Sequence, residues 1–345
     1  MALALALGAA GGFVAFKLRL PLAWMIGAII ATTLAALAGL ELRMSQGLRS
    51  FMVVVLGVML GSAFTPSILG RAAEWLPSIA SLLLYVSLLT ALVSFYLRKV
   101  ANYDPVTAYF AATPGGLNEM TIVGGAMGGD ERLISLVHGV RILLIAMTIP
   151  IWFRFFGGYQ PGGLPGPSGA AIPWRDLVIL VLCGAVGLGA ARLLRLPAAS
   201  LTGPMILSAA AHLSGFTASR PPLELIALAQ VVVGTAVGCR FAGFPLRQVL
   251  RTIANSIGQT AMMLALTIAA ALLLSPIVGA SVTALVLAFA PGGLAEMSLI
   301  ALSLGIDAAF VTSHHVARIV MVVLLAPLFF RALRGRLASK RVARS

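Results

Sequence analysis

Pro114-Gly-Gly-Leu-Asn-Glu-Met120 interrupts a long apolar segment of this 345-residue chain, and nearly the same heptapeptide returns as Pro291-Gly-Gly-Leu-Ala-Glu-Met297. Six of the seven residues agree at a spacing of 177 positions. Proline removes a backbone donor and glycine weakens a helix, so the break is costly in both places. An ionisable side chain at membrane depth is by default a candidate functional residue. The repetition therefore predicts one site that is built from two halves.

The composition is typical of an integral membrane protein. Hydrophobic residues make up 60% of the chain and charged residues 10%, whereas soluble domains carry about 25% charged residues. Apolar runs of about 20 residues are long enough to cross a bilayer as helices. The net charge is +14, but the basic residues lie between apolar runs or in the C-terminal tail. Basic residues in these places set the orientation of a membrane protein and interact with anionic lipid. We therefore expect the lipid bilayer as a partner and no nucleic acid.

The apolar segments form two sets of six that match at an offset of 176 or 177 positions. The offset pairs Leu20-Pro21 with Leu196-Pro197 and Asp130 with Asp307, and a register held over this length predicts an internal duplication. The expected segments are 1–16, 22–42, 51–69, 77–97, 105–128 and 132–153, then 177–194, 198–216, 225–243, 252–274, 281–304 and 308–330. We assign membrane repeat 1 to 1–157, a Pro/Gly-rich linker to 158–174, membrane repeat 2 to 175–331 and a basic C-terminal tail to 332–345.

The orientation of the two repeats depends on the interrupted segments. If every segment crosses the membrane, the halves are parallel. If 105–128 and 281–304 are broken or re-entrant, each half crosses five times and the second half is inverted, which places more Lys and Arg inside. We therefore predict an all-α polytopic protein of the plasma (inner) membrane with a cytoplasmic C-terminus. Its two homologous repeats, of about six segments each, are inverted and carry a broken or re-entrant helix at Pro-Gly-Gly.

Paired small residues occur in both halves. Gly57 and Gly61 have the spacing that lets two helices approach closely, and Gly234 and Gly238 repeat it. We expect these glycines to serve in helix packing.

Each Pro-Gly-Gly break predicts two half-helices in place of one helix. Pro114 and Pro291 end the first half-helix, and a second begins near Leu117 and Leu294. The first amides of a helix carry partial positive charge and suit a carboxylate or a phosphate. Irregular backbone at membrane depth is tolerated where it lines a cavity or is buried in protein. The two breaks are therefore candidates for the walls of a binding cavity.

The charged residues near the breaks have two interpretations. Glu119 and Glu296 either cap their half-helices and pair with an arginine, or couple transport to a proton or cation and contact the substrate. Arg141 and Arg318 lie deep in apolar sequence and cannot neutralise themselves, so each needs an anion. We expect each glutamate to lie within ion-pair reach of one of these arginines. A bidentate clamp on an anionic substrate is the alternative for the arginines.

The histidines offer packing, proton transfer or metal binding. His138 and His315 precede those arginines by three residues, on the same helical face, and His314 adjoins His315. Four histidines without a cysteine pair argue against a metal site, so we expect no metal and no cofactor. Asn118 stands opposite Ala295 in the duplication, a difference that suits one asymmetric ligand.

The two Pro-Gly-Gly-Leu-x-Glu-Met motifs and the Leu-Pro…Gly segments resemble the AbrB family of duplicated integral membrane proteins. That family is also described as a regulator or as an ammonia monooxygenase. The resemblance covers nearly the whole chain and carries over the signature positions Pro114–Met120 and Pro291–Met297, with no assigned catalytic residues. A monooxygenase needs copper or iron ligands, which this sequence scarcely offers. The architecture is also similar to that of cation–proton antiporters and anion transporters, a likeness of fold alone.

These patterns favour a secondary transporter of a small anionic metabolite through a midplane site formed by the two repeats, and not an enzyme. A membrane regulator or sensor is the alternative, and a membrane monooxygenase is the least favoured. We expect a small-molecule or ion ligand, and leave a homodimer open. The cavity itself should be lined by Asn118, Glu119, Thr121, Glu296 and Ser298. The full set of expected substrate-binding residues is Pro114, Gly115, Gly116, Asn118, Glu119, Thr121, Arg141, Pro291, Gly292, Gly293, Glu296, Ser298 and Arg318.

Overall fold

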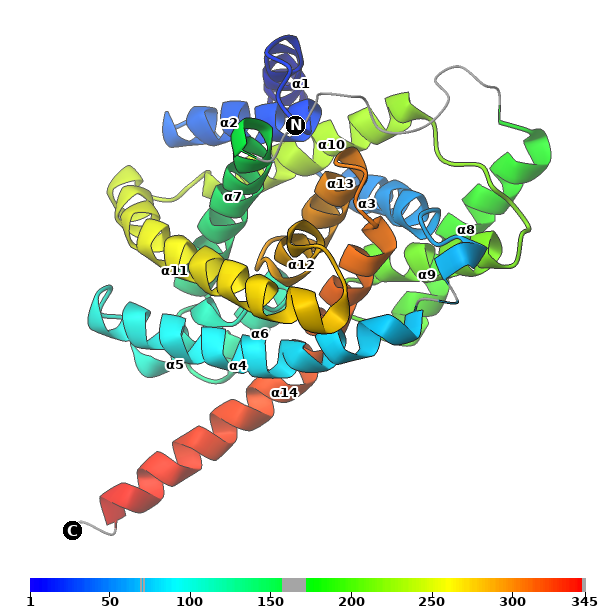
Figure 1. The fold of residues 1–345 in the computed structure, drawn as a ribbon. Helices are drawn as coiled ribbons and strands as arrows, with labels where there is room; N and C mark the ends of the chain where they lie inside the picture. The colour runs from blue at the N-terminus through cyan, green and yellow to red at the C-terminus, as the bar shows by residue number, and fades with distance from the viewer. Residues whose placement is uncertain (69, 71, 157–171, 343–345) are drawn as a thin grey trace.

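The computed structural model describes residues 1–68, 70, 72–156 and 172–342, and this part of the chain is helical and contains no strand (Figure 1). Most of the expected linker at 158–174 lies outside the described residues. The helices are α1 (Ala2–Lys17), α2 (Ala23–Leu37), α3 (Gln46–Gly61), α4 (Leu76–Lys99), α5 (Pro105–Ala112), α6 (Leu117–Ala126), α7 (Glu131–Phe156), α8 (Trp174–Leu193), α9 (Ala199–Leu213), α10 (Leu223–Gly238), α11 (Leu246–Val278), α12 (Val282–Phe289), α13 (Leu294–Ser303) and α14 (Ala308–Val342). Short 3₁₀ turns lie at η1 (Pro66–Ile68), η2 (Ala72–Trp75) and η3 (Cys239–Phe241).

Six helical stretches in the described residues are long and apolar enough to cross a membrane. They are Ala73–Lys99, Glu131–Phe153, Trp174–Leu193, Leu223–Phe241, Leu246–Val278 and Ala308–Ala332. Shorter apolar helices, among them α1, α2, α3 and α13, accompany them. The expected all-α membrane fold is confirmed by this content of helices.

Both Pro-Gly-Gly segments break a helix as predicted. The expected segment 105–128 is divided into α5 and α6, and 281–304 into α12 and α13, with the new helices beginning at Leu117 and Leu294. The four half-helices have 8 or 10 residues each. At 1.5 Å per residue each is about 12–15 Å long, against about 30 Å for the hydrocarbon core. No half-helix is long enough to cross alone.

Rare backbone conformations recur at the offset of the expected duplication. Arg19 and Arg195 have φ of 54° and 53°, and Leu22 and Ala198 have φ of 47° and 50°. Non-glycine residues seldom adopt positive φ, because the side chain then crowds the backbone. Each pair is 176 positions apart, so the turn that leads into α2 is built like the turn that leads into α9.

The two halves pack on each other reciprocally. A Cβ placed on Gly57 of α3 would lie 2.6 Å from the carbonyl oxygen of Leu201 in α9, and one on Gly234 of α10 would lie 2.5 Å from that of Met25 in α2. Met25 and Leu201 correspond at the offset of 176, so the two contacts are equivalent. The predicted packing role of these glycines is confirmed. Such an exchange of equivalent surfaces is the pattern of a two-fold relation.

The helices form two groups that share few contacts. The first helix group is α1–α3 with α8–α10, and the second helix group is α4–α7 with α11–α14. In the second group α4 and α11 run side by side, and α12 and α13 pack against α14 (Figure 1). In the described part of the chain, contact between the groups comes mainly from α2, α3 and η3 of the first against α7, α13 and α14 of the second. This division creates the place for a cavity.

Candidate functional site

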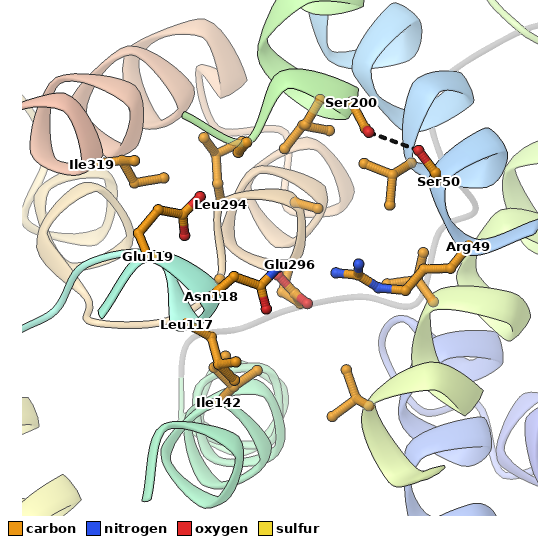
Figure 2. Close-up of a pocket in the computed structure, with 18 of the residues that line it drawn as sticks. Arg49, Ser50, Leu117, Asn118, Glu119, Ile142, Ser200, Leu294, Glu296 and Ile319 are labelled. Carbon is orange, nitrogen blue, oxygen red and sulfur yellow. Dashed lines mark hydrogen bonds between the residues drawn. The ribbon is translucent and has the colours of Figure 1, made fainter. Parts of the chain in front are cut away.

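A cavity of about 710 Å³ lies between the two helix groups. The second group contributes the start of α6, the start of α13 and one face each of α7 and α14, while the first contributes α3, α10, η3 and the turn from α8 to α9. A hydrogen bond of 2.7 Å between the hydroxyls of Ser50 and Ser200 joins α3 to α9 in its wall (Figure 2). The N-termini of the two second half-helices therefore face one shared space.

Nine of the thirteen expected binding residues line this cavity. They are Gly115, Gly116, Asn118, Glu119, Arg141, Gly292, Gly293, Glu296 and Arg318. Pro114 and Pro291 are buried in the breaks behind it. The other two expected residues, Thr121 and Ser298, do not line this cavity. Thr121 donates to the carbonyl of Leu117 at 2.8 Å, and the fully buried Ser298 accepts from Thr312 at 2.8 Å.

The glutamates of the motif lie against the N-termini of their own half-helices. Gly116 is the N-cap of α6 and Gly293 is the N-cap of α13, so each glutamate stands at the third helical position. From that position a carboxylate can turn back toward the free amides of the first turn. The carboxylates of Glu119 and Glu296 fill the space that a Cβ on the N-cap residue would need. Glycine at these two positions therefore makes room for the carboxylate.

The first glycine of each pair makes room for the methionine of the same motif. A Cβ on Gly115 would lie 2.7 Å from Cγ of Met120, and one on Gly292 would lie 2.8 Å from Cε of Met297. Both methionines are fully buried. The Gly-Gly-Leu-x-Glu-Met pattern is thus a local packing unit, in which the break, the cap and the buried methionine depend on one another.

The expected ion pairs between the glutamates and the buried arginines are absent among the described residues, and that prediction is wrong. Arg141 donates to the carbonyl of Thr113 at 3.5 Å and to Nδ1 of His138 at 2.9 Å. Arg318 donates to the carbonyl of Ala290, and to that of Gly292 at 3.0 Å. Each guanidinium therefore lies at the broken end of the preceding half-helix.

The ends of the half-helices explain why the arginines lie there. Thr113 and Ala290 are the C-caps of α5 and α12, where the last carbonyls have no intrahelical donor and carry partial negative charge. His138 donates from Nε2 to the carbonyl of Phe110 at 2.9 Å, and His315 donates to that of Leu287 at 2.8 Å. Each half thus has one histidine donor, one arginine donor and two carbonyl acceptors, and the corresponding residues are 177 positions apart. Carbonyls thus take the place that we had assigned to carboxylates.

His314 has a packing role. Its Nδ1 lies 2.8 Å from the carbonyl of Phe310, and its Nε2 lies 2.8 Å from the hydroxyl of Ser78. It therefore ties α14 to the start of α4. No group of three or more His, Cys, Asp or Glu within the described ranges could hold a metal ion.

Three arginines of the cavity were missed from the sequence. Arg49, Arg192 and Arg240 come from the first helix group and line the wall opposite the half-helices. They lie at the ends of apolar segments, where we had interpreted them as charges that orient the chain in the membrane. Together with Arg141 and Arg318 they set five arginines against two glutamates, a formal charge of +3 if all are ionised.

The fold and the site together define a polytopic α-helical membrane protein with a basic cavity between two broken helices. Residues 24–334 match the family model described as "Transition state regulatory protein AbrB", and the chain belongs to this family. It is 28% identical to "Uncharacterized protein YhjN" of Bacillus subtilis (strain 168), over 99% of this chain and 95% of that protein. It is 25% identical to "Putative regulator AbrB" of Escherichia coli (strain K12), over 93% of this chain and 92% of that protein.

Proposed function

We propose that this protein is a secondary transporter of a small anionic metabolite, without a catalytic step, in the plasma membrane and with a cytoplasmic C-terminus. One observation carries the proposal: a basic cavity lies where two broken helices present their N-termini. Interrupted helices whose N-termini point at an anionic group are a recurrent feature of secondary transporters. The inverted relation of the two repeats belongs to the same proposal.

The size and charge of the cavity suit a small carboxylate or phosphate ester. Ligand sites commonly enclose about 300–1,000 Å³, a range that includes this volume of about 710 Å³. Guanidinium groups match the geometry of carboxylate and phosphate oxygens. None of the five arginines makes an ion pair among the described residues. Their charge is therefore available to a ligand.

The division into two helix groups supports movement around the site. The cavity has one wall on each group, and the two groups share few contacts beyond it. A rotation of one group against the other would change the access to the cavity without breaking the half-helices. Motion of one bundle around a fixed site is how alternating access is achieved in many secondary transporters.

A membrane regulator or sensor is the second candidate. The name of the Escherichia coli relative favours it, since that protein is called a regulator. The same cavity would then bind the anion without moving it across the membrane.

Reconstitution separates the two candidates. Purified protein in liposomes is given labelled lactate, succinate, glutamate and phosphate in turn, and protein-free liposomes serve as the control. Accumulation of one anion above the control supports transport. Binding to the detergent-solubilised protein without accumulation in liposomes supports the sensor. Neither binding nor accumulation of any of these anions would overturn the assignment of an anion site.

A further inference from the structure

Glu296 holds the position that an anionic ligand would take at the start of α13. It is 93% buried, since its exposed fraction is 7%, and its carboxylate lies against the N-cap residue Gly293. The amides of the first helical turn are the natural partners of a bound anion. In this structure a carboxylate of the protein itself already occupies that place.

Two arginines of the first helix group face Glu296 across the cavity. Arg49 and Arg240 line the same cavity as Glu296, yet no ion pair within 4.0 Å joins them to it in the described part of the chain. Figure 2 shows the guanidinium of Arg49 and the carboxylate of Glu296 pointing toward each other. The space between them is part of the cavity, so an anion that binds the two arginines would lie beside Glu296.

Other ionisable groups on the neighbouring helices are engaged elsewhere or lie farther along the cavity. Arg141 of α7 and Arg318 of α14 bond to carbonyls, and the three histidines of these helices bond as described above. Glu119 lies on the other side of Asn118 from Arg49 (Figure 2). Glu296 is therefore the carboxylate that faces the free arginines.

The buried arginines give a second indication of a ligand, independent of the helix N-terminus. Arg141 and Arg318 are each 2% exposed and line the cavity, and Nε of each has no hydrogen-bond partner among the described residues. Buried polar atoms are normally satisfied, and a charged group that is not satisfied is costly. The cavity therefore holds more positive charge and more donors than its own side chains can satisfy.

We propose that an anion binds between Arg49, Arg240 and the start of α13, and that Glu296 takes up one proton when it does. Two carboxylates that share a site cannot both stay ionised without cost, so one of them holds a proton. Protonated Glu296 becomes a hydrogen-bond donor toward the ligand. The coupling is reciprocal: the anion raises the affinity for the proton, and the proton raises the affinity for the anion. This inference rests on the proposed transport function and names the proton as the coupling ion.

The test measures anion affinity against pH. Purified full-length protein in detergent is titrated with lactate and with methanesulfonate, both of which stay ionised between about pH 5.5 and about pH 8, so that only the protein titrates. As the pH rises, we expect the affinity of the wild-type protein for the anion to fall by up to about tenfold per pH unit, which is the limit for one linked proton. Glu296→Gln, a neutral mimic, should bind with little dependence on pH. Glu41→Gln, at an exposed glutamate outside the cavity, should behave as wild type.

A second measurement does not depend on any variant. Adding methanesulfonate to wild-type protein in weak buffer should remove about one proton from solution for each anion bound, as followed by an indicator dye. Binding without proton uptake would overturn the coupling while leaving the anion site and the transport proposal intact.

Loss of the pH dependence in Glu119→Gln but not in Glu296→Gln would overturn the assignment to Glu296. If neither anion binds the wild-type protein at any pH, both this inference and the anion site fail.

Discussion

Arg318 on α14 donates a hydrogen bond to the carbonyl oxygen of Ala290, the residue at which α12 ends. Arg141 makes the corresponding bond to Thr113 at the end of α5, 177 positions earlier. The two guanidiniums thus stabilise the C-terminal ends of the broken helices, while the two motif glutamates stabilise the N-terminal ends of the next ones. Each break therefore has an arginine at the C-terminal end of the first half-helix and a glutamate at the N-terminal end of the second.

Arg318→Leu should lower thermal stability more than Glu296→Gln. The leucine leaves two buried carbonyls without a donor, at about 1–3 kcal/mol for each, whereas glutamine can still accept from the amides of α13. Arg318→Lys should be intermediate, because an ammonium cannot span two carbonyls as a guanidinium does. Unfolding temperature in detergent is the measurement. Arg43→Leu, at an exposed arginine that pairs with Glu41, is the control. Equal temperatures for all four variants would contradict the role of Arg318 at the helix end.

Gly293→Ala should destabilise the protein, and removing the carboxylate should restore part of the loss. The new methyl group would collide with the side chain of Glu296, and overpacking of this kind costs about 1–3 kcal/mol. In the double variant Gly293→Ala with Glu296→Ala, the collision is absent. The double-mutant cycle, measured by thermal unfolding, should therefore be non-additive. Gly189→Ala is a matched control, since a Cβ there meets no atom within 4 Å. Additive effects would show that Gly293 and Glu296 do not share this space.

Gly57→Val and Gly234→Val should destabilise the fold by similar amounts. Both side chains would enter equivalent close contacts, α3 against α9 and α10 against α2. The measurement is the fraction of each variant that stays folded in detergent after heating, as determined by size-exclusion chromatography. Gly189→Val on α8 should be tolerated, because the space around it is open. A strong effect at Gly57 with none at Gly234 would argue against the reciprocal packing.

Arg49→Gln should weaken anion binding without weakening the fold. Arg49 is half-buried and its side chain makes no hydrogen bond or ion pair within the described residues, so stability should change by no more than about 0.5 kcal/mol. A hydrogen bond to a charged ligand group contributes roughly 1.5–3 kcal/mol, which predicts at least about a tenfold loss of affinity. Equilibrium binding of labelled lactate and phosphate is the readout, with Arg43→Gln as the control. Unchanged affinity would exclude Arg49 from the site.

The inverted arrangement predicts that equivalent loops lie on opposite sides of the membrane. Glu41 follows α2 and Ala218 follows α9, and both are exposed. In a background that lacks Cys183 and Cys239, Glu41→Cys and Ala218→Cys are treated in intact cells with a thiol reagent that does not cross the membrane. One cysteine should be modified in intact cells, and the other should be modified only after the membrane is permeabilised. Modification of both from the same side would show parallel repeats.

The helix breaks could be predicted from sequence because proline and paired glycine act locally. The second half-helices begin at Leu117 and Leu294, where the pattern placed them. The close packing at Gly57 and Gly234 was also predictable, since the spacing of small residues reports one helix face. In both cases the information lies within a few residues of the feature itself.

The charges of the site could not be assigned in the same way. We paired Arg141 and Arg318 with carboxylates because sequence shows only side chains, whereas their partners are backbone carbonyls at helix ends. Arg49 and Arg240 carry no pattern that separates them from other basic residues near the ends of apolar segments. Only the packing of the first helix group against the second brings them to face Glu296. Such contacts between distant segments require the fold.

The exchange of partners between the halves has a consequence for biosynthesis. Translation delivers α2 and α3 to the membrane well before their partners α10 and α9, which complete the chain's first helix group. Until residues 199–238 are made, Gly57 of α3 lacks the α9 backbone that it packs against, and the backbone of α2 lacks its contact with Gly234 of α10. Assembly must therefore wait for the second half, and a chain that stops in the linker would leave an incomplete product for membrane proteases to remove.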